Sequence, residues 1–172
     1  FYLGSPALNK GTNPFSEAFD QRGSGFSRVL AGQADIGALE GAVAAPSLVV
    51  SNINDSGEGS LRQAILNANS LTGADTITFN PTFFSTPRTI TLGGTQLFLS
   101  DTAATTITGP GSNLLTISGN NLSRVFQIAG GASAAISGIT ITGGQNADGG
   151  GLLSSGTLTI HNSRFTNNKA NN

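Results

Sequence analysis

Short apolar bursts separated by small and polar residues fill the chain after residue 75. Examples are Thr-Ile-Thr-Phe at 76–79 and Leu-Leu-Thr-Ile-Ser at 114–118, each flanked by Gly and Asn. Such bursts between turn formers are typical of short strands joined by tight turns. The pattern predicts strands at 76–79, 88–92, 95–100, 105–109, 114–118, 125–128, 134–142, 152–160 and 163–166.

One segment has a helical period instead. Leu61, Ala64, Ile65 and Ala68 are spaced at i, i+3, i+4 and i+7, which places all four on one face of a helix. Ser56 and Ser60 are both candidate N-caps for this helix. The spacing predicts a single amphipathic helix over 60–69 whose apolar face packs against an apolar part of the fold.

A repeat of 24 residues relates the later strands to one another. At this offset Ile117 aligns with Ile141 and Phe165, Ile136 with Ile160, Thr142 with Thr166, Gly143 with Asn167, and Gly144 with Asn168. A period in the twenties that contains several strands indicates a solenoid. We therefore expect an all-β fold, a right-handed parallel β-helix with apolar residues inward, Thr and Ser outward, and Gly and Asn at the corners. An ordinary β-sandwich is the alternative.

A solenoid needs both ends covered, because an open strand edge pairs with any strand that it meets. The predicted helix comes just before the first turns, which is where a cap belongs. The residues Asn-Asn-Lys-Ala-Asn-Asn at 167–172 contain no comparable element. We therefore expect either further chain or another copy of the protein to cover the last turn.

Composition narrows the range of partners. Only 10% of the residues are charged, the formal net charge is -1, and there is no cysteine. A chain with so little charge creates no field that would hold nucleic acid or an anionic membrane. Its apolar runs are also much shorter than the roughly 18 residues that a membrane helix needs. We expect neither a nucleic-acid partner nor a membrane span.

Candidate catalytic groups are few and scattered. Parallel β-helices include polysaccharide lyases and hydrolases, which gather several Asp on adjacent turns for acid/base work or for calcium. Asp75, Asp101 and Asp148 include no adjacent pair, and no two of them are one repeat apart. The single histidine, His161, has no carboxylate or nucleophile beside it in sequence, and we expect it to be exposed. We therefore predict that the protein is not an enzyme.

Asp148 lies in the glycine-rich stretch 143–151, which is loosely like the calcium loops of repeat toxins. One Asp cannot supply the six to eight oxygens that Ca²⁺ prefers unless carbonyl groups converge with it. We expect a plain turn and no cofactor, with calcium at Asp148 as the alternative.

Two further motifs carry a resemblance to a known family. The stretch from Asp55-Ser56-Gly57-Glu58-Gly59-Ser60-Leu61-Arg62 to Asp75-Thr76-Ile77-Thr78-Phe79, and later Gly149-Gly150-Gly151-Leu152, resembles bacterial cell-surface β-helix modules. These modules belong to the polymorphic outer-membrane and adhesin-like β-helix repeat family. The resemblance implies an extracellular location at a bacterial cell surface.

Residues 1–40 resemble the opposite, closing end of the same module. The similarity rests on the motifs Asp20-Gln21-Arg22-Gly23 and Asp35-Ile36-Gly37-Ala38-Leu39-Glu40. In this chain the closing motif precedes the opening motif. The resemblance implies an irregular arm over 1–40, a linker over 41–46, and the β-helix over 47–172. Either the chain crosses a boundary between tandem modules, or its arm caps another copy.

The candidate assembly and capping residues are therefore the apolar face of the helix and five residues of the arm, namely Asp20, Arg22, Asp35, Ile36 and Gly37. We expect the charged members of the arm to form a structural network of turns and ion pairs. We predict an extracellular structural or adhesive protein that forms rigid rods or filaments by tandem or head-to-tail association. The alternative is a carbohydrate-active β-helix, a lyase or hydrolase, or a module that binds surface glycans.

Overall fold

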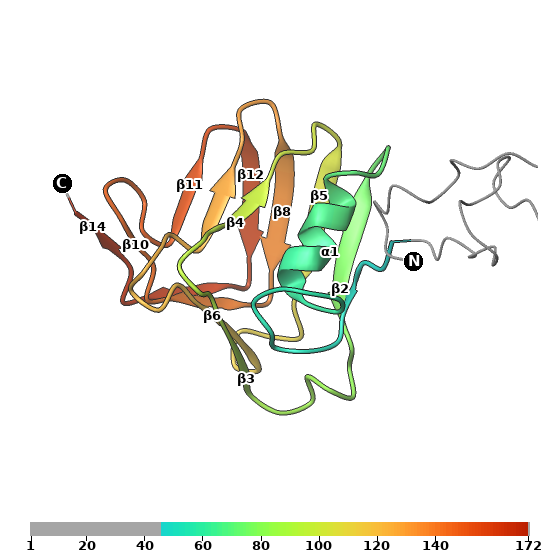
Figure 1. Ribbon diagram of the computed structural model, residues 1–172, viewed down its shortest axis with the longest axis horizontal. Helices are drawn as coiled ribbons and strands as arrows, with labels where there is room; N and C mark the ends of the chain where they lie inside the picture. The colour runs from blue at the N-terminus through green and yellow to red at the C-terminus, as the bar shows by residue number, and fades with distance from the viewer. Residues whose placement is uncertain (1–45, 172) are drawn as a thin grey trace, which may run out of the picture. The chain divides into compact units, whose positions relative to one another are not determined.

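The protein is described from a computed structural model, which covers residues 46–171. Short strands wind into a parallel β-helix of about five turns, and one short helix lies at its start (Figure 1). Every strand pair in the described part is parallel. The predicted parallel β-helix is confirmed, and the β-sandwich alternative is wrong, because sandwiches are built from antiparallel sheets.

Three parallel sheets form the walls of the β-helix, and a two-stranded pair adds to its last turns. Sheet 1 consists, in order, of β1 (Val49–Val50), β2 (Asp75–Phe79), β5 (Ala104–Thr108), β8 (Ser133–Ser137) and β12 (Thr157–His161). Sheet 2 consists of β3 (Arg88–Thr91), β6 (Leu115–Ser118), β9 (Thr140–Thr142) and β13 (Arg164–Thr166). Sheet 3 consists of β4 (Leu97–Leu99), β7 (Phe126–Ile128) and β11 (Leu152–Ser154), and the additional pair is β10 (Gln145–Asn146) with β14 (Lys169–Ala170).

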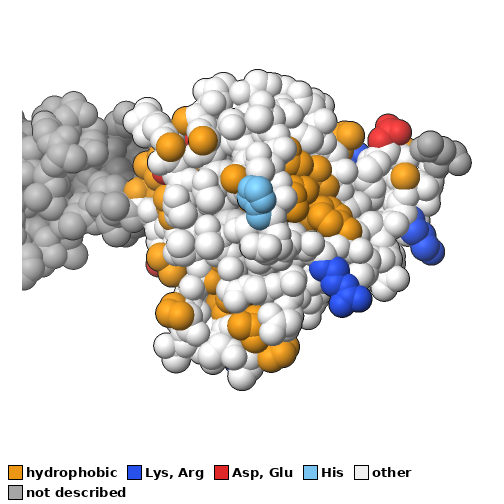
Figure 2. Space-filling view, turned by 180° about the vertical axis from the view of Figure 1, so that it is seen from behind, with side chains coloured by type: hydrophobic (Ala, Val, Ile, Leu, Met, Phe, Trp, Pro, Cys, Tyr) orange, Lys and Arg blue, Asp and Glu red, His pale blue; other side chains and the backbone are white. Residues whose placement is uncertain are grey.

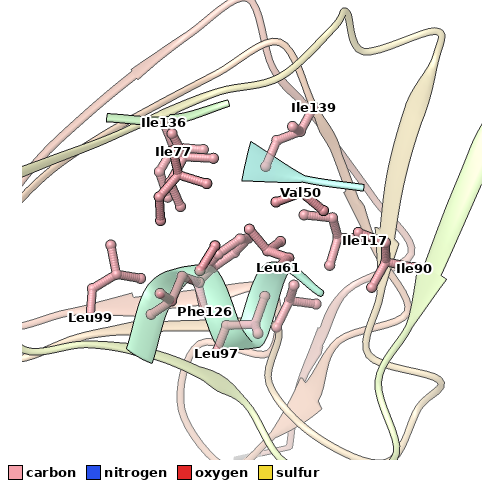
Figure 3. Packing of buried hydrophobic residues seen from close by; sticks show 14 of the residues in the cluster. Val50, Leu61, Ile77, Ile90, Leu97, Leu99, Ile117, Phe126, Ile136 and Ile139 are labelled. Atoms are coloured by element: carbon pink, nitrogen blue, oxygen red, sulfur yellow. The ribbon is translucent and has the colours of Figure 1, made fainter. Parts of the chain in front are cut away.

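Alternation along each strand decides which side chains enter the core. In β2, Ile77 and Phe79 are buried, whereas Thr76 and Thr78 are exposed. Successive side chains of a strand point to opposite faces, so one face fills the interior and the other faces water. Figure 3 shows how the inward residues of the three sheets meet in one core, where Ile77 and Ile136 lie opposite Leu97 and Phe126.

The strand register confirms the 24-residue repeat in the later turns. Ile160 pairs with Ile136, and Phe165 pairs with Ile141, which itself pairs with Ile117. The earlier turns are longer, since Ile77 pairs with Ile107, 30 residues later, and Ile107 with Ile136, 29 residues later. The sequence period therefore describes only the last turns, although the stacking is continuous.

Left-handed backbone at the corners repeats at the same spacing. Gly138 has φ of 67° and Asn162, its equivalent in the next turn, has φ of 49°. Gly143 and Asn167 form a second such pair, with φ of 57° and 53°. Glycine and asparagine are the residues that most readily adopt this conformation. The sequence can therefore exchange one for the other at a corner without changing the path of the chain.

The predicted helix is confirmed as α1 (Leu61–Ala68). Its N-cap is Ser60, whose hydroxyl accepts a hydrogen bond from the backbone N–H of Gln63 at 3.1 Å, and so Ser60 takes the role that the sequence left open between it and Ser56. The four residues predicted to form the apolar face are all buried: Leu61, Ala64, Ile65 and Ala68. Figure 3 shows Leu61 directed into the core beside Leu97.

Two side chains of this first turn close the outer edge of β4. Arg62 donates to the carbonyl oxygens of Thr95 and Gln96 at 2.7 and 2.8 Å. Asn69, the C-cap of α1, donates to the carbonyl oxygen of Phe98 at 2.9 Å and accepts from the N–H of Ser100 at 3.0 Å. These bonds take the place of a neighbouring strand, so the helix caps sheet 3 in hydrogen bonding as well as in packing.

Candidate assembly surface

The fifth turn of the β-helix exposes residues that belong to the core by register. Ile77, Ile107, Ile136 and Ile160 form one continuous column along sheet 1. The first three are completely buried, whereas 36% of Ile160 is exposed. Ile160 follows the same inward phase as the others, and its exposure results from the position of β12 at the edge of the sheet in the described part of the chain.

Sheet 2 has a similar column of core residues, which ends in a phenylalanine rather than an isoleucine. Its column is Ile90, Ile117, Ile141 and Phe165, and the exposed fraction is at most 1% for the three isoleucines but 45% for Phe165. Within residues 46–171, β13 pairs only with β9, and β12 only with β8. Within the described residues, the fifth turn therefore has both unpaired strand edges and exposed apolar side chains. We call Leu158, Ile160 and Phe165 together the terminal apolar face.

The opposite end of the solenoid is covered along β1 and β4. The backbone N–H of Ser51 donates to the carbonyl oxygen of Gly59 at 2.8 Å, and the N–H of Val49 donates to the hydroxyl of Ser47 at 3.2 Å, so two N–H groups at the outer edge of β1 are already used. The helix covers β4 as described above. The two ends of the described solenoid therefore differ, since the chain itself covers β1 and β4 at one end, whereas the other end presents strand edges and exposed apolar side chains.

Most of the surface carries little charge. Figure 2 shows a face composed mainly of backbone and of side chains that are neither hydrophobic nor charged, with hydrophobic side chains gathered near its middle and Lys and Arg side chains towards one end. Arg164 in β13 and Lys169 in β14 are exposed basic residues of the fifth turn. His161, the last residue of β12, is exposed as the sequence predicted.

Arg124 determines what the glycine-rich loop around Asp148 can bind. The Arg124 side chain is buried, and its Nε donates to the carbonyl oxygens of Asp148 and Gly149 at 3.2 and 2.9 Å. These are main-chain oxygens of the kind that Ca²⁺ would need at this loop. The Asp148 residue itself is exposed. Calcium at Asp148 stays a prediction, and the guanidinium already satisfies the neighbouring carbonyl groups.

The same arginine connects three turns of the solenoid. Its Nη1 donates to Gln96 Oε1 at 2.9 Å in the turn before and to Gln127 Oε1 at 3.2 Å in its own turn. Gln96 and Gln127 are also hydrogen bonded to each other. Because the Asp148 and Gly149 carbonyls belong to the following turn, Arg124 stabilises the stacking of all three. The sequence alone gave no sign of this role, since Arg124 has no counterpart one repeat away.

The other candidate residues lie apart. Asp75 begins β2 and faces the interior, Asp101 follows β4, and Asp148 is on the loop before β11. Among residues 46–171 no group of three or more His, Asp or Glu side chains is placed to hold a metal ion. The predicted assembly residues Asp20, Arg22, Asp35, Ile36 and Gly37 lie outside the described residues, and their roles stay predictions. No helix in the described part is long and apolar enough to cross a membrane.

Comparison of the chain with protein-family models, curated proteins and solved structures gives no match. The resemblance to adhesin-like modules therefore stays a prediction, while the parallel β-helix follows from the structure itself.

Proposed function

We propose that this protein is an extracellular structural module of a bacterial cell surface. In this proposal the β-helix is part of a rigid rod, and further solenoid turns stack on its fifth turn, supplied by a tandem module or by another copy. The observation that carries the proposal is the difference between the core columns in the fourth and fifth turns. Ile136 and Ile141 are fully buried, whereas 36% of Ile160 and 45% of Phe165 are exposed.

The physical argument concerns apolar area and strand edges together. Burial of a Phe or Ile side chain stabilises by about 1.5–3 kcal/mol when it is complete, and the terminal apolar face realises only part of that value. A further turn would cover these side chains and would also use the hydrogen-bonding groups on the outer edges of β12 and β13. In a solenoid each such interface between turns adds to the total stability.

Uncharged walls also favour a structural role. The outward residues of β2 are Thr76 and Thr78, and those of β5 include Thr106 and Thr108. Thr packs well on a pleated sheet and keeps the surface wettable without charge. Walls of this kind in sheet 1 favour extension of the rod along its axis, through the terminal apolar face, over side-by-side association.

The test compares two phenylalanines of nearly equal exposure. Phe165 belongs to the terminal apolar face with 45% of its surface exposed, and Phe98 lies on the outward face of β4 with 43% exposed. We expect the full chain to show concentration-dependent assembly by sedimentation velocity and electron microscopy, with an axial repeat. Phe165→Asp should abolish this assembly, whereas Phe98→Asp should leave it unchanged.

A second experiment, on a tandem chain, covers the case in which separate copies do not associate. In a chain that carries a second copy of residues 46–171 after the first, we expect Ile160 and Phe165 of the first copy to become protected, which hydrogen exchange of β12 and β13 would measure. The proposal is wrong if the single chain stays monomeric at high concentration and the tandem chain shows no added protection. Equal loss of assembly in both Phe variants would contradict it as well.

A further inference from the structure

The outward face of sheet 1 carries a regular array of small hydroxyl and methyl groups. Figure 1 shows β2, β5, β8 and β12 side by side, and the strand register keeps their outward residues in columns. Two columns make up what we call the outer array. The first is Thr76, Thr106, Ala135 and Thr159, and the second is Thr108, Ser137 and His161 with Thr78 in the same phase of β2.

The geometry of a parallel sheet sets the spacing of the outer array in both directions. Neighbouring strands lie about 4.7–4.9 Å apart, and alternate residues of one strand lie about 6.6 Å apart, twice the rise of about 3.3 Å per residue. Thr is β-branched, so its χ1 is restricted and its hydroxyl and methyl groups have fixed places. Ile77, Ile107 and Ile136, all fully buried, hold the same strands from the inside. A ligand therefore meets a preorganised pattern, which lowers the cost of binding.

The hydroxyl groups of the outer array are available to a ligand. Among residues 46–171, the only one of them that bonds to another part of the chain is that of Ser137, which donates to the carbonyl oxygen of Ile107 at 3.4 Å. The outward face of sheet 2 differs, because the hydroxyl of Thr140 donates to the carbonyl oxygen of Ser112 at 2.7 Å and the exposed Arg164 adds a charge. Sheet 1 is thus the wall with free hydroxyl groups.

The outer array offers neither a formal charge nor an aromatic platform. None of its residues is Lys, Arg, Asp or Glu, and none is Phe, Tyr or Trp. Sugar rings pack best on exposed Tyr or Trp, so a crystalline polysaccharide is not the ligand that this face favours. The ligand that fits is neutral, donates and accepts hydrogen bonds, and repeats in two dimensions at a similar spacing. Water in the surface of an ice crystal has all of these properties.

We propose that the outer array is an ice-binding surface. Its threonine hydroxyl groups hydrogen bond to water molecules of the crystal, and the methyl groups between them order the water that lies over the sheet. Each contact is weak, but contacts at several lattice positions hold together, so the protein leaves the crystal only when all of them break. The outer array lies on the side of sheet 1 that faces away from the core. It is separate from the terminal apolar face and does not depend on the assembly proposal.

The experiment follows a single ice crystal in a solution of the full chain. It measures the gap between the melting and freezing temperatures of the crystal, and the amount of protein that a slowly growing ice surface takes up. We expect a measurable gap and enrichment of the protein in the ice, because adsorbed molecules block the sites at which the crystal grows. No gap at the highest soluble concentration, together with exclusion of the protein from the ice, would overturn the proposal.

Two lysine variants separate the outer array from the rest of the surface. Thr106→Lys places a charge between Thr76 and Ala135 in the middle of the first column, and should abolish both effects. Thr116→Lys is the matched control, because Thr116 is a half-buried, outward threonine of the same turn on sheet 2, and it should behave as the natural chain does. Circular dichroism and the melting temperature show that both variants are folded. Ice binding that is lost in Thr116→Lys and kept in Thr106→Lys would contradict the proposal.

Ala135→Thr keeps the proposal testable if Thr106→Lys does not fold. Ala135 is the one residue of the first column without a hydroxyl group, so the replacement completes a run of four threonines and should widen the gap between melting and freezing. A purely structural role of the wall gives no such gain, and an unchanged or smaller gap would count against ice binding. Binding of the natural chain to crystalline cellulose or chitin, without any effect on ice, would overturn the proposal by assigning the face to polysaccharide.

Discussion

Replacing Ile136 and Ile160 separately by alanine tests how the core is covered along the solenoid. The two residues are register partners in the same column, but Ile136 is completely buried and 36% of Ile160 is exposed. Removal of a buried isoleucine costs the transfer free energy of the lost atoms and leaves a cavity, about 2–5 kcal/mol in total. We expect about 3–4 kcal/mol for Ile136→Ala.

Ile160→Ala should cost much less in the single chain. Its side chain has a neighbouring turn on one side only, so the space left by the mutation opens to solvent and no closed cavity forms. The lost transfer term is then a fraction of the value for full burial, or about 1 kcal/mol. Urea unfolding followed by circular dichroism measures both free energies of unfolding.

The comparison also reports on assembly. When a further turn covers β12, the cost of Ile160→Ala should rise towards that of Ile136→Ala, because both residues then lie between two turns. Equal costs in the monomeric chain would refute the reasoning, since they would mean that Ile160 is already covered. An unchanged small cost in the assembled or tandem form would refute the stacking of turns on the fifth.

Further predictions concern the groups that hold the turns in place. Arg124→Ala should lower the free energy of unfolding by about 2–3 kcal/mol, because it leaves buried carbonyl and amide oxygens without a donor, while Arg88→Ala at an exposed arginine should change it far less in the same urea experiment. Ser60→Ala removes the N-cap of α1 and should cost about 1 kcal/mol, whereas Ser56→Ala should leave the melting temperature unchanged, and an equal effect of both would mean that the cap is assigned to the wrong serine. Gly138→Ala should destabilise strongly, because a Cβ would lie 2.6 Å from the carbonyl oxygen of Gly109 at a residue with φ of 67°, and a melting temperature equal to that of the natural chain would contradict this.

The candidate sites were only partly visible in the sequence. The terminal apolar face could be foreseen because Ile160 and Phe165 align with buried isoleucines at the repeat spacing. The outer array also left a sign, since Thr76 and Thr78 alternate with Ile77 and so had to face outward. The pairing of Thr76 with Thr106 could not be foreseen, because the first turns do not follow the 24-residue spacing and the offset between these two residues is 30.

Local pattern was enough for the helix and for most of the strands. The predictions of single strands over 134–142 and 152–160 are wrong, because each segment turns a corner and forms two strands, β8 and β9 in the first and β11 and β12 in the second, and β1, β10 and β14 were not predicted. The spacing of Leu61, Ala64, Ile65 and Ala68 specified both the helix and its buried face, because side chains three and four residues apart share one side of a helix. Alternation of apolar residues with Thr and Ser did the same for the strands. Both signals depend on a few neighbouring residues, which any single sequence displays.

Contacts between turns were decided only by the tertiary structure. Arg124 reaches Gln96 and the carbonyl oxygen of Asp148, which lie 28 residues before it and 24 residues after it. Asn69 takes the place of a strand beside β4 by bonding to Phe98, 29 residues away. Loops of different length set which turn lies over which, and hydrogen bonds of this kind have no fixed spacing. The sequence therefore determined most of the elements and which face of each is apolar, whereas stacking decided which polar side chains meet.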